Sequence, residues 1–546
     1  MHKIEVDVTR LGGGFGGKED QATPWAVMVA LAVQLLNKPV KLILERHDDM
    51  RMTGKRHPYE SIYKIGLDEN YKIIAFDCKF LQNSGAAADL SPAIAERTLF
   101  HATNSYYIPN VSTIVHSCKT NLPPNTAFRG FGGTQGMFVI ESAIVKAAET
   151  LKVTAQHIQE INLLKENDVF SYGQIAKQVN TKATWNQAKT DFKFEEKQAE
   201  IEQFNAKNHL VKKGISFMPI TFGISFTNTM MNQARALVHV YQDGSVGVST
   251  GAVEMGQGVN TKMLQIAAII FGIHSDLVKI ESTNTTRVAN TSPSAASATA
   301  DLNGKALLMA CNSIKDRLKT IAANHLSVLE KEIELKDQYV FVNGNKSDLK
   351  WENLVLNAFM QRVSLSENAH YATPEIHFDK TKEKGHPFAY HVYGTAITTV
   401  KLDCLRGIYD VEDVSIVHDF GKSMNTAIDL GQIEGGLVQG IGWMTMEEIA
   451  YGTNGKLLSN TLSTYKVPDI FSVPKTIHTK SLDTSGHDLA ILKSKAVGEP
   501  PLMYGIGTYF ALENAIKSFN PNYKKQFNSP MTPEKALMGL YQNETN

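Results

Sequence analysis

The sequence predicts a mixed α/β protein of the α+β type, with at least two large units. The chain has 546 residues, which is too long for a single hydrophobic core. Strand and helix signals alternate through the first third and return after residue 210, and no repeat of about 20 to 50 residues is visible. These features exclude a solenoid and a simple barrel.

The first unit begins with apolar residues at every second position from Ile4 to Val8, the pattern of a half-exposed strand. The pattern then predicts, in order, a mostly apolar helix over 22–36, a buried strand over 40–44, two strands between 63 and 81 broken at 68–70, and a helix over 137–151.

A change of composition over residues 166–212 predicts the boundary between the units, near residue 170. We therefore expect one unit over 1–170 and another over 171–546, with the charged stretch as a solvated helix face. The second unit predicts strands over 217–226, 236–242, 246–249, 390–402 and 407–418, helices over 257–271, 302–318 and 428–446, and polar connecting chain over 319–352.

Composition excludes several classes of protein. Lys and Arg number 55 and so do Asp and Glu, so no overall field favours nucleic acid or a membrane surface. There is no long apolar run and no signal-peptide pattern at the start, which favours the cytoplasm. The four cysteines have no C-x-x-C spacing, so we expect neither a disulfide framework nor an iron–sulfur or zinc site made by this chain's cysteines alone.

The most informative feature is the tetrapeptide Gly-Phe-Gly-Gly, which occurs at 14–17 and again at 130–133. Glu19 follows the first copy and Arg129 precedes the second. Glycine runs let backbone amides approach a ligand closely and allow positive φ. An aromatic ring beside fixed charges and bare amides suits a flat heteroaromatic substrate near an anionic cofactor.

A dinucleotide-binding domain is the rival interpretation of the first glycine run. Gly12, Gly14 and Gly17 satisfy G-x-G-x-x-G, and Glu45 closes a second expected strand. However, the first strand alternates with charged residues, whereas the first strand of such a domain is continuously apolar. The five glycines also exceed what the turn needs.

Three further loops, at 254–258, 290–297 and 431–436, place Gln or small hydroxyl residues among glycine or alanine next to an expected helix. Together they suggest one large polar, anionic ligand held by amides and helix starts. Glu499 lies between Gly498 and two prolines, which restrict the backbone. A rigid carboxylate of this kind suits a general base.

Eight collinear motifs resemble the xanthine dehydrogenase/oxidase family of molybdenum hydroxylases, over residues 3–510. They are GGGFGGKE, ERTLF, TAFRGFGG, FGISFT, EMGQG, NTSPSAAS, DLGQIEGGLVQG and KAVGEPPL. The resemblance implies a molybdopterin-type cofactor sandwiched between two elongated subdomains. Residues 1–170 would carry the substrate-side glycine loops, and residues 171–546 the pterin loops and the catalytic base.

The resemblance also implies roles for individual residues. Glu499 matches the catalytic base, and Glu19 and Arg97 match the pair that binds the two ends of a purine, a pair that aldehyde oxidases of the family lack. Matching positions for the remaining site are Phe131 and Phe226 around the purine, Thr227 as a hydroxyl contact, Phe15, Arg129 and Ala296 lining molybdenum, and Gly16, Gln257, Ala295 and Gln432 at the cofactor.

The family's catalytic subunit has a substantial region before the first glycine motif, and that N-terminal part is missing here. The resemblance implies hydroxylation of hypoxanthine and xanthine, with electrons passed to [2Fe–2S] clusters and FAD on partner chains or regions, and an assembled dimer. An enzyme acting on aldehydes or other N-heterocycles, or an inactive fragment that serves in assembly, stays open as an alternative.

Overall fold

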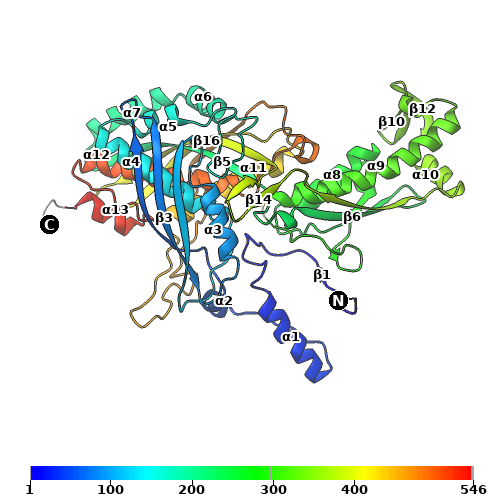
Figure 1. The fold of residues 1–546 in the computed structure, drawn as a ribbon, viewed down its shortest axis with the longest axis horizontal. Coiled ribbons are helices and arrows are strands. Elements are labelled where there is room, and N and C mark those ends of the chain that lie inside the picture. Colours follow the sequence, from blue (N-terminus) through cyan, green and yellow to red (C-terminus); the bar gives the residue numbers. More distant parts are fainter. Residues whose placement is uncertain (1, 296, 543–546) are drawn as a thin grey trace.

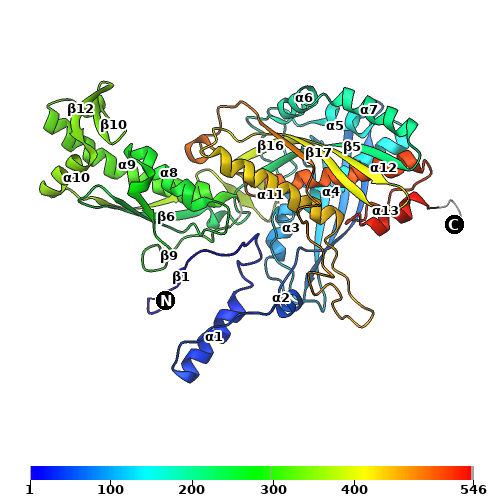
Figure 2. The same ribbon diagram turned by 180° about the vertical axis from the view of Figure 1, so that it is seen from behind.

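The computed structural model describes residues 2–295 and 297–542, which form a large lobe and an elongated arm (Figures 1 and 2). Helices and strands are mixed throughout both parts, so the predicted mixed α+β class is confirmed. Among the described helices, none combines the length and apolar character needed to cross a membrane.

A four-stranded sheet lies at the centre of the large lobe. Its strands, in spatial order, are β18 (Thr476–Ser481), β17 (Tyr409–His418), β16 (Tyr390–Asp403) and β5 (Val211–Ile224). All neighbours are antiparallel except β17 and β18. Helix α12 (Ile506–Phe519) packs so closely on β5 that a Cβ at Gly214 would lie 1.9 Å from the carbonyl oxygen of Ala511.

The second sheet of the large lobe lies next in sequence to helix α3, which carries Arg97. It contains β2 (Tyr59–Leu67), β3 (Ile73–Gly85) and β4 (Asn110–Lys119), with β3 in the middle. The two strands predicted between 63 and 81 are therefore confirmed, and so is the helix over 137–151, which begins earlier, as α4 (Gly133–Leu151). Helix α3 (Ser91–Phe100) connects β3 to β4.

The remaining helices of the large lobe complete its surface. They are α2 (Arg46–Met52), α5 (Ala155–Asn162), α6 (Thr181–Asp191), α7 (Phe194–Lys207), α11 (Thr426–Thr445) and α13 (Pro533–Leu540), with the short hairpin β14 (His377–Asp379) and β15 (Lys384–His386). The charged stretch after residue 181 forms α6 and α7, as predicted. Only Phe194 and Ile201 of α7 are buried.

The arm consists of residues from about 229 to 372 and has a core of its own. Its elements are β6 (Gln233–Val240), β7 (Val246–Thr250), α8 (Val259–Phe271), β8 (Val278–Ile280), β9 (Thr283–Asn284), α9 (Ala298–Leu326), β10 (Ile333–Lys336), β11 (Tyr339–Val342), β12 (Asn345–Lys350), α10 (Trp351–Met360) and β13 (Ser366–Ala372). The polar connection expected over 319–352 is wrong: it contains the sheet β10–β12, whose short strands bury residues such as Ile333 and Val340 and expose polar neighbours.

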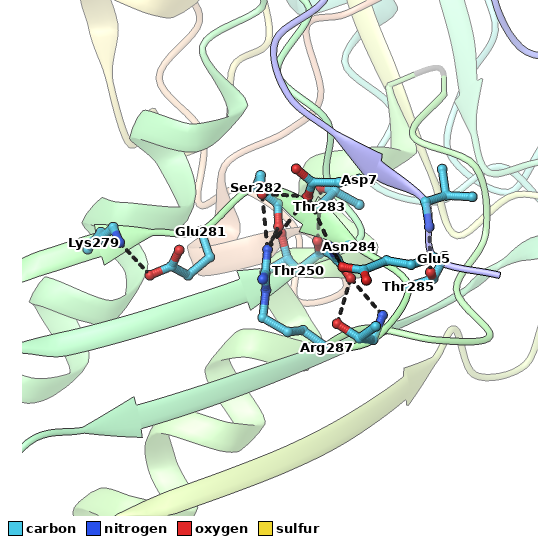
Figure 3. A network of polar contacts seen from close by, with 12 residues as sticks. Glu5, Asp7, Thr250, Lys279, Glu281, Ser282, Thr283, Asn284, Thr285 and Arg287 are labelled. Atoms are coloured by element: carbon cyan, nitrogen blue, oxygen red, sulfur yellow. Dashed lines mark hydrogen bonds and ion pairs between the residues drawn. The ribbon is translucent and has the colours of Figure 1, made fainter. Parts of the chain in front are cut away.

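The N-terminal segment runs from the arm to the large lobe. Strand β1 (Asp7–Val8) pairs antiparallel with β9, and Asn284 Nδ2 donates to Glu5 Oε1 at 2.7 Å (Figure 3). Arg287 Nη2 donates to the carbonyl oxygen of Ser282 at 2.6 Å and closes the same polar network. The strand predicted around Ile4 to Val8 is thus short, and it belongs to the arm.

Two expectations for the next residues have different outcomes. The apolar helix over 22–36 is confirmed as α1 (Thr23–Leu36), although none of its residues is buried. The buried strand over 40–44 is wrong: the segment is extended and largely exposed, because no described strand lies beside it. Because β1 pairs antiparallel with β9 and no second strand follows α1, residues 4–45 form no βαβ unit, and the dinucleotide-binding alternative is wrong as well.

The predicted division near residue 170 stays a prediction. In space, residues on both sides of it share the core of the large lobe, where Ile140 packs in one cluster with Phe217 and Ile397. Short 3-10 helices complete the fold: η1 (Thr229–Met231), η2 (Ser275–Leu277), η3 (Glu330–Glu332), η4 (Ile491–Lys493) and η5 (Pro500–Gly505).

Candidate active site

Both Gly-Phe-Gly-Gly tetrapeptides fold into the same left-handed turn. The amide of the fourth residue donates to the carbonyl oxygen of the first, at 2.9 Å in 14–17 and 2.8 Å in 130–133. Phe15 has φ of 52° and Phe131 of 47°, and the glycine after each also has positive φ. A bulky residue is uncommon in this conformation and costs strain of about 1–3 kcal/mol, which functional sites retain.

The first turn lies between two other glycine loops. A Cβ at Gly16 would lie 2.9 Å from the carbonyl carbon of Ala127, just before the second turn. A Cβ at Gly14 would lie 2.6 Å from Met255 Sδ, in the loop over 254–258. Close approach to the backbone therefore requires glycine at Gly16, whereas a side chain at Gly14 would displace the end of Met255. Three loops that are distant in sequence meet here.

Arg129 joins the second turn to the C-terminal motifs. Its Nε donates to the carbonyl oxygen of Gly498, and its Nη2 donates to both the carbonyl oxygen and Oε1 of Gln432, each at 3.1 Å. Burial lowers the pKa of Arg129 to about 10, although the negative charge of Glu499 opposes that shift. The half-buried guanidinium thus lies beside the expected base.

Glu499 is buried, with 5% of its surface exposed, and is fixed by Ser297. Its Oε2 accepts from the amide of Ser297 at 3.3 Å and from its hydroxyl at 3.4 Å, and the amide of Glu499 donates to Ser297 Oγ at 2.8 Å. Ser297 is a site residue that sequence reasoning missed, although it ends the singled-out loop over 290–297. The Glu499 carboxylate is therefore held in one orientation at the start of η5.

A buried ion pair anchors the loop that carries Glu499. Lys495 Nζ lies 2.6 Å from Asp419 Oδ2, and both side chains are almost fully inaccessible. Burial alone would raise the pKa of Asp419, but the charge and hydrogen bond of Lys495 outweigh it and lower the pKa. The amide of Ala496 donates to the Tyr390 hydroxyl at 3.1 Å. The sequence motif contains Lys495 but gives no sign of its partner.

Arg97 lies on α3, and its two terminal nitrogens donate to backbone carbonyls at the end of β5. Its Nη1 donates to the carbonyl oxygen of Gly223 at 2.8 Å, and its Nη2 donates to that of Ser225. Burial lowers its pKa, and the charge of Glu499 acts in the opposite direction. Arg97 is thus brought close to Glu499, with its guanidinium orientation fixed by backbone carbonyls.

Glu19 is the second carboxyl group of the site. Its pKa is raised to about 8, first by burial and then by the negative charges of Glu499, Asp20 and Asp89. A carboxyl group with that pKa is mostly neutral at pH 7 and can donate a hydrogen bond. Arg97, Arg129 and Glu19 therefore all lie within electrostatic range of Glu499.

The aromatic positions are placed differently from one another. Phe131 is half-buried, whereas Phe15 is 54% exposed. The amide of Phe226 donates to Asn232 Oδ1 at 2.8 Å, and its ring packs against the start of α9. Thr227 is buried beside it. The first turn is therefore open to solvent on the side that Phe15 faces.

The residues expected to contact the pterin are only partly available for hydrogen bonds to a ligand. Gln257 uses its amide within its own loop, because Nε2 donates to the carbonyl oxygen of Val253 at 2.9 Å and Oε1 accepts from the amide of Met255. Ala295 is buried. Ala296 lies outside the described residues.

The Glu254 carboxylate occupies the start of α8, where we expected an anionic ligand to bind. Its Oε1 accepts from the amides of Gly256 at 2.8 Å and Gly258 at 3.0 Å, and its Oε2 accepts from that of Asn260 at 3.0 Å. The first amides of α8 are thus satisfied by the protein's own carboxylate, so the expectation that they bind a ligand is corrected.

The surface beside these loops has features that suit a large, flat cofactor. A Cβ at Gly431 or Gly435 would meet nothing within 4 Å, so the first turns of α11 present bare backbone to open space. Gln439 lies four residues further along α11. Its Oε1 is buried and has no hydrogen-bond partner among the described residues. Gly431 and Gly435 can therefore accept a ligand without displacing a side chain.

No group of three or more His, Cys, Asp or Glu residues in the described part of the chain is arranged to hold a metal ion.

Comparison with protein families gives two matches that cover most of the chain. Residues 1–163 match one molybdopterin cofactor-binding domain and residues 187–474 match a second. The two matches include both Gly-Phe-Gly-Gly turns, Arg97, Gln257 and Gln432; Glu499 lies after them.

Curated relatives resemble nearly the whole chain. It is 40% identical over 541 residues to xanthine dehydrogenase/oxidase of Mus musculus and 39% identical over 552 residues to xanthine dehydrogenase 1 of Arabidopsis thaliana, covering 98% and 99% of this chain. The chain spans about 39% of the length of each of these relatives.

Solved structures share the fold at lower identity. Quinoline 2-oxidoreductase from Pseudomonas putida 86 superimposes with a TM-score of 0.87 at 23% identity, over 99% of this chain and 69% of that one. Aldehyde oxidoreductase from Desulfovibrio gigas gives a TM-score of 0.81 at 22% identity, over 97% and 54%. The chain therefore belongs to the xanthine dehydrogenase family and corresponds to the molybdopterin-binding part of its members.

Proposed function

We propose that this chain is the molybdenum-cofactor part of a purine hydroxylase that converts hypoxanthine to xanthine and xanthine to urate. The observation that carries the proposal is the buried, rigid Glu499 carboxylate, surrounded by Glu19, Arg97 and Arg129. Relatives at about 40% identity that are named xanthine dehydrogenases support the same activity.

The cofactor would lie against the glycine loops and the bare face of α11. Gly431 and Gly435 offer it open backbone. When bound, the molybdenum cofactor would take two electrons from the substrate and supply an oxygen atom derived from water. Phe15, Arg129 and Ala296 are the positions that the proposal assigns to the vicinity of the metal.

Glu499 would act as the general base. Its Oε2 is held by Ser297, whereas no described residue hydrogen-bonds to Oε1, which leaves that oxygen free to accept a proton. A base fixed by a second residue has the geometry that general-base catalysis requires, with a typical contribution of about 100- to 10,000-fold.

Glu19 and Arg97 would select purines. A neutral carboxyl group can donate to a ring nitrogen or carbonyl oxygen, and a guanidinium stabilises negative charge that develops on the ring. Phe131 and Phe226 would contact the ring faces, and Thr227 would add a hydroxyl contact. A simple aldehyde leaves the Glu19 carboxyl group without a hydrogen-bond partner, which a buried site penalises.

The reduced site would pass its electrons to [2Fe–2S] clusters and FAD carried by partner chains or regions. The relatives are long enough to hold such regions, because this chain spans about 39% of their length. The assembled protein would be a dimer in the cytoplasm.

The decisive experiment replaces Glu499 with Gln in the assembled protein. We expect urate formation from xanthine to fall at least about 100-fold, with molybdenum content unchanged. Glu352→Gln, at an exposed position of α10 on the arm, is the matched control and should retain full activity. Turnover that survives in Glu499→Gln at full metal content would refute the role of the base.

The same assay distinguishes the alternatives. Turnover of benzaldehyde but not of hypoxanthine by the unsubstituted protein would favour a relative that acts on aldehydes. Absence of molybdenum from the assembled protein would favour a non-catalytic role in assembly.

A further inference from the structure

Helix α1 is apolar on all sides and touches almost nothing. No residue of it is buried, and six of its aliphatic side chains are between 39% and 75% exposed: Val27, Met28, Leu31, Val33, Leu35 and Leu36. The helix contains no charged residue and projects away from the large lobe (Figures 1 and 2). A helix of 14 residues has marginal stability on its own, and one that is apolar all round is normally buried.

The segment after α1 is an extended chain without a partner. Residues 39–45 form no strand pair with any described residue, and both Leu42 and Ile43 are largely exposed. An unpaired extended segment offers its backbone amides and carbonyls to a strand from another polypeptide.

A second exposed apolar segment projects from the same side of the large lobe, at the bottom of both views (Figures 1 and 2). It includes Leu462, Ile470 and Phe471, all largely exposed. Arg56, four residues after the end of α2, lies within electrostatic range of Tyr465 in this segment. The chain from 39 to 56 therefore runs between the two apolar regions, by way of the charged helix α2.

This surface adjoins the site. α1 begins four positions after Glu19, and the base of the helix is attached to the large lobe by Gln21, whose Nε2 donates to Asp89 Oδ2 at 2.7 Å. Phe15, in the first Gly-Phe-Gly-Gly turn, is exposed on the same N-terminal segment. Whatever covers α1 would also abut the open first turn.

We propose that α1 and residues 39–45 are the docking surface for a folded polypeptide module, which adds a strand beside 39–45, buries α1 and closes the site over Phe15. The module corresponds to the part of the longer relatives that this chain does not span. The solved chain of quinoline 2-oxidoreductase has the same fold over 69% of its length, which leaves nearly a third of it without a counterpart here.

Other occupants fit less well. A lipid surface favours helices with basic residues on a polar face, and α1 has none. A second copy of the chain could cover α1 with its own apolar helix. It would, however, leave the first Gly-Phe-Gly-Gly turn uncovered. These occupants are distinct outcomes of the test.

The test places a photo-crosslinking amino acid at Leu31 in the intact chain, produced in cells of its own source. A second crosslinker at Met360, an exposed residue of α10 on the arm, is the control. We expect Leu31, and not Met360, to crosslink to a polypeptide that resembles the unspanned part of the relatives. Crosslinking of Leu31 to a second copy, to lipid, to an unrelated protein or to nothing would overturn the proposal.

Introducing charge into the apolar surface of α1 gives an independent readout. Val27→Glu with Leu31→Glu should reduce co-purification of that polypeptide at least about 100-fold, because two glutamates would be buried without partners. Leu356→Glu with Met360→Glu on α10 should not reduce it. Since α1 packs on nothing, the thermal midpoint of the isolated chain should be unchanged. Equal co-purification with both double variants would contradict the proposed surface.

Neither measurement depends on turnover. Loss of the docking interaction and failure of the purine assay are therefore separate results, and either proposal can be refuted while the other survives.

Discussion

At the scale of single residues, the site depends on positions where the backbone itself contacts a neighbour. In the second Gly-Phe-Gly-Gly turn, a Cβ at Gly132 would lie 2.3 Å from the carbonyl oxygen of Ile94, and φ at Gly132 is +93°. Two separate penalties therefore act on any side chain at this position, one from sterics and one from the backbone conformation.

A pair of alanine substitutions separates these penalties. Gly344 also has positive φ, at +80°, but a Cβ there would meet nothing within 4 Å. We expect Gly344→Ala to lower the free energy of unfolding by roughly 1 kcal/mol. Gly132→Ala should lower it by at least about 3 kcal/mol, since the turn must also move away from α3. Urea denaturation measures both, and equal losses would show that the close contact contributes nothing.

A buried carboxyl group outside the site predicts an unusual dependence of stability on pH. Glu141 on α4 accepts hydrogen bonds from Asn104 and Tyr106 at Oε1 and from Gln159 at Oε2. Burial raises its pKa to about 7, although these hydrogen bonds favour the charged form. Between about pH 4.5 and 7 the unfolded chain releases this proton while the folded chain keeps it, so folding loses stability as the pH rises.

Replacing Glu141 with Gln should remove that dependence. The change corresponds to roughly 3 kcal/mol between pH 4.5 and 7, at about 1.4 kcal/mol per pKa unit. Gln159 can accommodate the new amide by rotating, because its Oε1 has no partner among the described residues. Glu149→Gln, at the surface end of α4, is the control and should keep the dependence, because its pKa is lowered. A stability profile of Glu141→Gln that parallels that of the unsubstituted protein would contradict the prediction.

At the scale of elements, the loop from 490 to 499 is held in place by hydrogen bonds and an ion pair with distant residues. The amide of Ile491 donates to Asp301 Oδ1 at 2.9 Å, and Lys495 forms its buried pair with Asp419. Asn180 Nδ2 also donates to Asp419 Oδ2, at 2.8 Å. The orientation of Glu499 therefore depends on contacts from three distant parts of the chain.

Lys495→Met tests this anchor. It would leave Asp419 buried without its cation, and we expect the free energy of unfolding to fall by about 3–5 kcal/mol. Lys475→Met is the control, because its pair with Asp410 has the same type of contact at 2.7 Å but is exposed. The control should lose less than about 1 kcal/mol. Amide hydrogen exchange over 494–500 should rise in Lys495→Met alone, and unchanged exchange there would show that the pair does not hold the loop.

The sequence predicted elements whose information is local. Alternation and turn residues predicted β2 and β3, and the repeated tetrapeptide indicated two equivalent loops, which fold as the same turn. The buried strand predicted over 40–44 was wrong, because its burial would need a neighbouring strand that the described chain does not contain. Ser297 and Asp419 were missed because their partners lie 202 and 76 positions away in the chain, and such pairs leave no local pattern.

At the scale of the whole molecule, only a few segments of the described chain join the arm to the large lobe. The core of the arm consists of residues from 236 to 358 together with Ile491, which precedes the loop of Glu499. The N-terminal segment crosses the same junction through β1 and β9 (Figure 3). Both Ser297, at the start of α9, and Glu499 lie at this junction, so the base is held between two separately packed bodies.

Separate cores predict separate unfolding. Trp185 stacks on Phe217 in the large lobe at 4.2 Å between ring centroids, and Trp351 donates to the carbonyl oxygen of Gly244 inside the arm at 2.8 Å. With 5-fluorotryptophan incorporated, each of the four tryptophans should give its own fluorine NMR signal. We expect the native signal of Trp351 to disappear at a lower urea concentration than that of Trp185, because the smaller body buries less of its surface. Coincident loss of the two signals would mean that the junction couples arm and lobe into one cooperative unit. In that case the contact between Ser297 and Glu499 would form only when the whole molecule folds.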